Sequence, residues 1–76
     1  MKYGPINIDP EILGGTPVFT GTRVPVQTIF DYLEGGDDVN EFLDDFPSVS
    51  KEAALEVLGM AKKSLTTEKM LDENFA

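Results

Sequence analysis

The sequence predicts a mainly α-helical domain with a small N-terminal β part. Apolar residues recur with helical spacing in three segments between residues 27 and 65, whereas short apolar runs alternate with glycine and proline over residues 1–26. We therefore expect one domain over residues 1–65, in which a β segment (1–26) precedes a three-helix body (27–65). The polar tail, residues 66–76, either adds one short helix or orders only on binding.

A short strand is expected near the N-terminus. Ile6 and Ile8 alternate with Asn7 and Asp9, and this period of two is typical of an edge strand. Pro10 then ends the strand, because proline has no backbone N–H to donate to a neighbouring strand.

A tight hairpin is expected between residues 18 and 24. Two short runs, Val18-Phe19 and Arg23-Val24, flank Thr20-Gly21-Thr22, and glycine supplies the positive φ that such turns need. Because two short strands alone are marginal in water, we expect them to pair across a two-fold axis with a second copy. Pairing within one chain is the alternative.

Three amphipathic helices are expected in the body. The first ends at Gly35-Gly36, the second begins in a capping box of Asp38 and Glu41 and ends before Pro47, and the third follows the cap residue Ser50. Their apolar faces are carried, in order, by Val26, Ile29, Phe30 and Leu33; by Val39, Phe42, Leu43 and Phe46; and by Ala54, Val57, Leu58, Ala61 and Leu65. This order is typical of a trihelical helix-turn-helix body, although antiparallel helix packing gives the same pattern.

Acidic residues dominate the charge of the chain. Fourteen acidic and six basic residues give a formal net charge of −8, and Arg23 is the single arginine. This balance disfavours a free-standing nucleic-acid binder and favours a basic protein partner such as a nuclease. Solubility alone is the other explanation for an acidic surface.

Several classes of function are disfavoured by the composition. The chain has no histidine, no cysteine and no serine beside a plausible base, so we expect no enzymatic activity. The glycines lack the spacing of phosphate-binding loops, and adjacent aspartates at 37–38 and 44–45 diverge by about 100° on a helix, so we expect neither a cofactor nor a metal. No apolar run is long enough for a signal peptide or a membrane span, and we expect a cytoplasmic location.

The glycine and proline motifs resemble those of DUF433, a family of small bacterial and archaeal proteins. The family pattern is matched, over about residues 5–63, by Pro10-Glu11-Ile12, Gly14-Gly15, Pro17-Val18, the run from Gly21 to Val26, and then Glu41, Leu43, Phe46 and Pro47. Leu13 departs where the family often has cysteine, and Thr16 and Thr20 depart where basic residues are frequent. These departures lower the positive charge of the hairpin.

The resemblance implies a helix-turn-helix-like body, a homodimer, and an antitoxin of the VapB type that pairs with a small PIN-like nuclease toxin. On this hypothesis we expect Met70, Leu71 and Phe75 to anchor in an apolar groove of the toxin, while Asp72 and Glu73 approach its basic substrate path. A DNA-binding transcriptional regulator and a small homodimeric interaction module are the alternatives.

Four basic residues are candidates for contacts outside the chain. Arg23 contacts a partner or, alternatively, forms an ion pair with Asp9 or Glu11 that fixes the hairpin. Contact with DNA is expected to fall to three lysines of the third helix, Lys51, Lys62 and Lys63. Its first turn carries an unfavourable glutamate and no arginine, asparagine or glutamine to read a base, so we expect weak DNA binding by the isolated chain.

Overall fold

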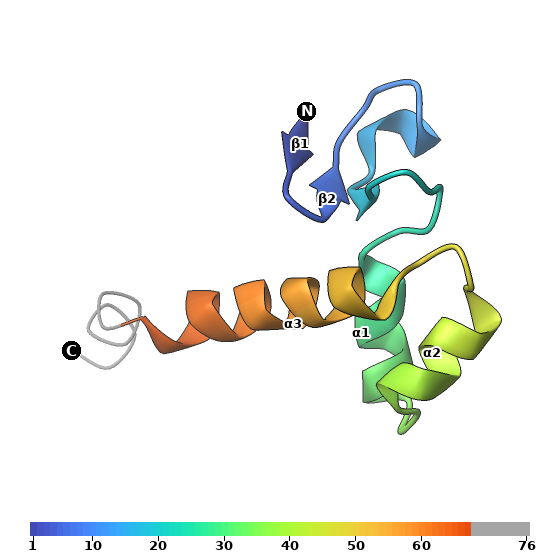
Figure 1. The fold of residues 1–76 in the computed structure, drawn as a ribbon. Coiled ribbons are helices and arrows are strands. Elements are labelled where there is room, and N and C mark those ends of the chain that lie inside the picture. Colours follow the sequence, from blue (N-terminus) through green and yellow to red (C-terminus); the bar gives the residue numbers. More distant parts are fainter. Residues whose placement is uncertain (68–76) are drawn as a thin grey trace.

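A computed structural model describes residues 1–67 of the 76-residue chain. Three short strands and a 3-10 turn, Leu13–Gly15, precede three helices (Figure 1). The prediction of a mainly helical fold with a small N-terminal β part is therefore confirmed. The predicted tail contacts of Met70, Leu71 and Phe75 lie outside the described residues.

The strands form one antiparallel sheet in the order β1 (Lys2–Tyr3), β2 (Ile6–Asn7) and β3 (Val18–Phe19). β2 is thus the central strand, and the predicted single edge strand is wrong. A turn at Gly4-Pro5 divides the first residues into two strands, since Gly4 takes a φ of 62° and proline favours turns. All three strands pair within the chain, which is the alternative to pairing across a two-fold axis; pairing with a second copy stays a prediction.

The predicted hairpin is present, although its second arm is not a regular strand. The Phe19 N–H donates to the Val24 carbonyl at 2.9 Å, and the Val26 N–H donates to the Pro17 carbonyl at 2.9 Å. Gly21 allows the reversal with a φ of 81°. Pro25 forms only an isolated bridge with Val18, because proline lacks a backbone donor.

The helices are α1 (Gln27–Glu34), α2 (Val39–Asp45) and α3 (Lys51–Thr66). The starts of α2 and α3 confirm the predicted caps. The Asp38 carboxylate accepts from the Glu41 N–H at 2.9 Å, and the Ser50 hydroxyl accepts from the Ala53 N–H at 3.0 Å. Each cap satisfies a donor that the first helical turn would leave without a partner.

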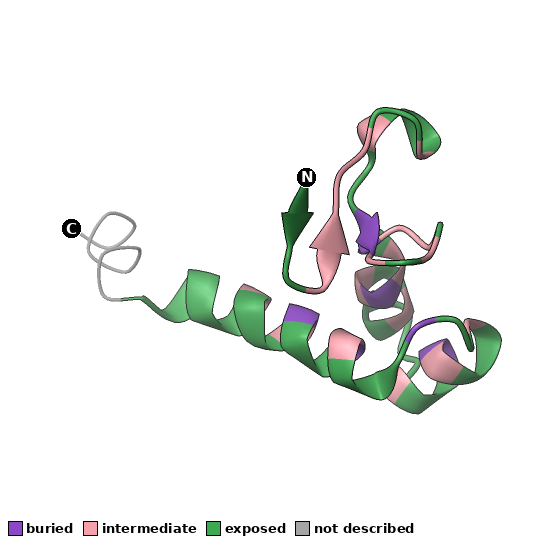
Figure 2. Cartoon of the chain, turned by 45° about the horizontal axis from the view of Figure 1, so that its top comes forward, coloured by how far each residue is buried: buried purple, intermediate pink, exposed green. Residues whose placement is uncertain are grey.

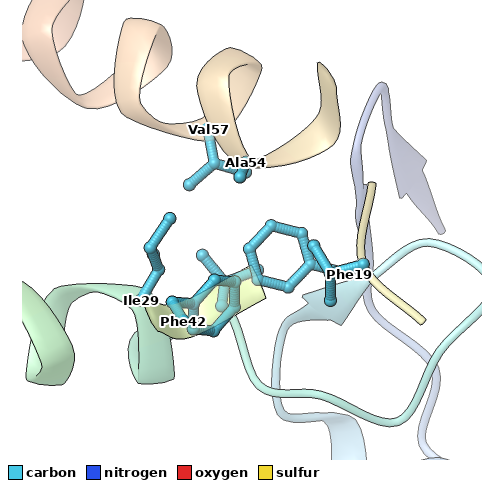
Figure 3. Close-up of a cluster of buried hydrophobic side chains, with 7 residues drawn as sticks. Phe19, Ile29, Phe42, Ala54 and Val57 are labelled. Atoms are coloured by element: carbon cyan, nitrogen blue, oxygen red, sulfur yellow. The ribbon is translucent and has the colours of Figure 1, made fainter. Parts of the chain in front are cut away.

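The core lies where the sheet, α1, α2 and the first half of α3 meet (Figures 2 and 3). Phe42 is fully buried at its centre, with ring centroids 5.8 Å from Phe19, 5.5 Å from Tyr32 and 5.3 Å from Phe46. The other buried apolar residues are Val18, Val26, Ile29, Val49, Ala54 and Val57.

Only the first half of α3 packs on this core. The helix extends away from the body, and its last turns are exposed (Figures 1 and 2). Leu65, predicted on the packed face, is 66% exposed. That part of the prediction is wrong, because the apolar periodicity of α3 continues beyond the point at which the body ends.

Candidate partner-binding surface

Seven exposed acidic residues are concentrated in α1, α2 and the connection between them. They are half of the fourteen acidic residues of the chain, and no lysine or arginine occurs over residues 24–50. We call this group the acidic lobe: Asp31, Glu34, Asp37, Asp38, Glu41, Asp44 and Asp45.

The connection between α1 and α2 fixes the shape of the lobe. The Gly35 N–H donates to the Asp31 carbonyl at 3.0 Å, which ends α1. The Asp37 N–H then donates to the Tyr32 carbonyl at 2.9 Å, and Asp38 caps α2. Glu34, the last residue of α1, and Asp38, the N-cap of α2, therefore lie at the adjoining ends of two helices that pack against each other (Figure 1).

Negative charge is dense enough in the lobe to change ionisation. A side-chain hydrogen bond with Asp37 raises the pKa of Glu41, and the charges of Asp37 and Asp38 act in the same direction. A backbone hydrogen bond from Asp38 lowers the pKa of Glu41 in part compensation. The surrounding negative charge thus favours the protonated form of Glu41 more than in an isolated glutamate.

At Asp45, the hydrogen-bond donor to the lobe is the neutral hydroxyl of Tyr32. The Tyr32 hydroxyl donates to Asp45 Oδ2 at 2.5 Å, and this bond with the nearby carboxylates raises the pKa of Tyr32 to about 12. Among residues 1–67, no lysine or arginine forms an ion pair with these carboxylates. The lobe therefore has unused capacity for cations supplied from outside the chain.

The arrangement of carboxylates in the lobe does not suit a metal ion. Within the described part of the chain, no three carboxylates converge closely enough to hold one. The lobe is instead spread over two helices and their connection, a distribution that suits the separate lysine and arginine side chains of a protein surface.

Arg23 is exposed at the hairpin, outside the lobe. The expected ion pair with Asp9 or Glu11 is not formed within the described residues, so this alternative is wrong. Asp9 instead accepts a hydrogen bond from the Glu11 N–H through Oδ1 at 2.9 Å. The guanidinium is consequently available for an external contact.

The three candidate DNA-binding lysines are all exposed on α3. Lys51 and Lys62 share one side of the helix, about 16 Å apart along its axis at 1.5 Å per residue. Lys63 points about 100° away from Lys62. The structure therefore does not gather the three into one patch.

The family match covers most of the segment that forms the sheet and the helices. Residues 6–61 match the family described as "Protein of unknown function (DUF433)". The chain belongs to the DUF433 family. The predicted resemblance is thereby confirmed, and the family description names no activity.

Comparisons with two individual proteins show how much of this chain resembles each of them. The crystal structure of a DUF433 member from Anabaena variabilis ATCC 29413 has a TM-score of 0.65 and 28% identity, and covers 91% of this chain and 66% of that chain. An uncharacterized protein, y4eO of Sinorhizobium fredii (strain NBRC 101917 / NGR234), is 43% identical over 47 residues. These residues are 62% of this chain and 21% of that protein, so the match spans about a fifth of the relative.

Sequence reasoning did not identify the acidic lobe of this DUF433 protein. From the sequence, Asp38 was interpreted only as a helix cap, and the adjacent aspartates at 37–38 and 44–45 were considered only as metal ligands. The signal that identifies the lobe is the absence of any basic residue over residues 24–50, combined with helical spacing on both sides of Gly35-Gly36.

No helix within residues 1–67 has the length and hydropathy to cross a membrane.

Proposed function

We propose that this DUF433 protein is a non-enzymatic antitoxin that binds a basic, PIN-like nuclease and blocks its nucleic-acid path. The observation that carries the proposal is the acidic lobe, with seven exposed carboxylates over residues 31–45 and no basic residue among them. A nuclease holds a polyanionic substrate with lysine and arginine side chains, and the lobe offers those side chains an alternative set of anionic groups.

The negative charge of the chain also favours rapid association with such a partner. A net charge of −8 attracts a basic protein over several ångströms, which raises the association rate at low salt. The repulsion between Asp37 and Glu41 is relieved when a cation approaches them. A cation that binds there therefore lowers the pKa of Glu41, and association weakens as the pH falls and Glu41 becomes protonated.

The remaining predicted contacts keep their place in this proposal. Met70, Leu71 and Phe75 anchor in an apolar groove of the nuclease, and the exposed Arg23 makes a further contact. The complex forms in the cytoplasm. Deletion of residues 68–76 tests the anchors separately from the lobe, because every carboxylate of the lobe lies outside the deleted segment.

The first experiment is to purify the tagged chain gently from its own host and identify any small protein that copurifies in equal amount. A nuclease-like partner is then assayed for RNA cleavage with and without the chain. Equimolar inhibition supports the proposal, whereas a partner without nuclease activity contradicts it.

The lobe is tested by neutralising three of its carboxylates that make no hydrogen bond to described residues: Asp31→Asn, Glu34→Gln and Asp44→Asn together. A matched control carries Glu11→Gln, Glu52→Gln and Glu56→Gln, three exposed glutamates outside the lobe, and has the same net charge. We expect association with the nuclease to slow on the order of tenfold in the lobe variant and much less in the control. Equal effects in the two variants would show that net charge alone steers binding.

DNA binding is the second candidate function. It is favoured by the short α2, the connection Phe46 to Ser50 and the longer α3, on which Lys51 and Lys62 share a side. The acidic lobe on α2 opposes it. If the isolated chain binds duplex DNA with an affinity that falls steeply with salt, and alanine at Lys51 and Lys62 flattens that dependence, the regulator function is supported.

A further inference from the structure

A stripe of leucines and lysines runs along one side of α3, next to the face that packs on the core. At 100° per residue, five side chains fall within an arc of about 80°, namely Lys51, Leu55, Leu58, Lys62 and Leu65. We call these five residues the cationic stripe. Leu55 is 51% exposed, Leu65 is 66% exposed, and both lysines are exposed. The fold therefore leaves most of this apolar surface open.

The body of the molecule approaches α3 from other directions. Val57, which is buried in the core, lies about 120° around the helix from the centre of the stripe. On the other side, a Cβ built on Gly4 would lie 4.0 Å from Glu56 Oε2, and Glu56 lies about 140° from that centre. The last turns of α3 also extend beyond the body (Figure 1). A helix of another protein therefore has access to the stripe.

The residues that flank the stripe are small. Ala54 and Ala61 border it on one side and Gly59 on the other. A glycine inside a helix is less favourable than alanine, and a Cβ on Gly59 would meet nothing within 4 Å in this chain. Packing inside the chain therefore does not require this glycine, whereas close approach of a partner helix benefits from it.

The charge of the stripe is opposite to that of the chain. Both of its charged members are lysines, whereas the whole chain has a net charge of −8. The glutamates of α3, Glu52 and Glu56, lie about 100° and 140° around the helix from the centre of the stripe. The surface that a partner would meet is therefore apolar and positively charged.

We propose that the cationic stripe of α3 binds an acidic amphipathic helix of another protein. The leucines pack against the apolar face of that helix, while Lys51 and Lys62 pair with the carboxylates beside it. The leucines favour this occupant over DNA, because a phosphate backbone gains little from contact with apolar side chains. The stripe is about 21 Å long, so about 14 residues of partner helix cover it, and we expect a Kd of about 10 μM.

Two synthetic helical peptides of about 18 residues test the charge preference of the stripe. Both carry leucine at a and d positions, but one has glutamate and the other lysine at the flanking e and g positions. Fluorescence anisotropy of each labelled peptide, kept at nanomolar concentration, measures its binding to the full chain. We expect the glutamate peptide to bind at least about tenfold more tightly than the lysine peptide. The net charge of −8 alone predicts the reverse order, so equal binding or tighter binding of the lysine peptide overturns the proposal.

Two matched pairs of variants test the location. Lys62→Glu and Lys63→Glu change the net charge equally, but Lys63 points about 100° away from Lys62. We expect Lys62→Glu to weaken binding of the glutamate peptide on the order of tenfold, and Lys63→Glu to weaken it much less. Leu65→Gln and Met60→Gln make the same comparison for apolar surface, because Met60 is 43% exposed but lies on the opposite side of α3 from the stripe. Equal effects within either pair overturn the proposal.

Duplex DNA is the third probe. If the duplex binds more tightly than the glutamate peptide, and Lys51→Ala weakens that binding while Leu65→Gln does not, the stripe is a nucleic-acid surface and the proposal is overturned.

The three-carboxylate lobe variant separates this inference from the proposed antitoxin function. Its substitutions lie outside α3, so we expect it to bind the glutamate peptide at least as tightly as the unaltered chain does. Loss of peptide binding in the lobe variant overturns the proposal, because the binding site would then include the lobe. Loss of nuclease binding alone concerns only the antitoxin function.

Discussion

Phe42 connects the acidic lobe to the core, and its replacement by alanine tests whether the lobe depends on that packing. The side chain is fully buried, and its ring lies between 5.3 and 5.8 Å from the rings of Phe46, Tyr32 and Phe19. Loss of a buried phenylalanine costs about 3–5 kcal/mol, and each aromatic pair adds about 0.5–1.5 kcal/mol beyond the buried area. We therefore expect Phe42→Ala to lose about 4–5 kcal/mol.

This loss is large for a chain of this size. At about 0.05–0.15 kcal/mol per residue, 76 residues give a free energy of unfolding of about 4–11 kcal/mol. Urea unfolding followed by circular dichroism at about 25 °C measures the change, provided that the slope with urea is unchanged. Phe42→Leu gives a graded comparison, with an expected loss of about 2 kcal/mol. Leu33→Ala, at a 37% exposed position of α1, serves as the control and should lose less than about 1 kcal/mol.

A loss below about 2 kcal/mol for Phe42→Ala would refute the reasoning, because it would mean that the core collapses around the missing ring. A loss as large for Leu33→Ala as for Phe42→Leu would refute it as well. In that case burial would not determine which residues hold α1 and α2 together.

Two further predictions concern charge and backbone. Because the pKa of Glu41 is raised in the fold from 4.5, its protonated form stabilises the protein below that value, and this contribution is lost as the pH rises through the raised pKa. Glu41→Gln should therefore raise Tm at about pH 7 but not at about pH 3.5; an equal gain at both values would exclude the mechanism. Gly59→Ala should stabilise the chain by about 1 kcal/mol in urea unfolding at dilute concentration, because its Cβ meets nothing and alanine favours helices. Gly21→Ala should destabilise the chain by about 1–2 kcal/mol. The cause would be backbone strain alone, since Gly21 has a φ of 81° and an added Cβ would meet nothing within 4 Å. A stabilising effect of Gly21→Ala would show that the hairpin relaxes.

The helices could be predicted from the sequence because their ends depend on neighbouring residues. Asp38 and Ser50 cap helices through donors three positions later, and Gly35 ends α1 through a bond within its last turn. The sheet could not be predicted in the same way. The pairing of Ile6 with Phe19 joins residues far apart in the chain, and it depends on the Gly4-Pro5 turn.

The surfaces were harder to predict than the helices for a related reason. The periodicity of α3 places Leu65 on the same face as Val57, but it does not say where the neighbouring elements end. Only the structure shows that the body stops short of Leu65, which leaves it 66% exposed. The acidic lobe likewise depends on how α1 and α2 turn at Gly35-Gly36, which brings carboxylates from two helices to one corner.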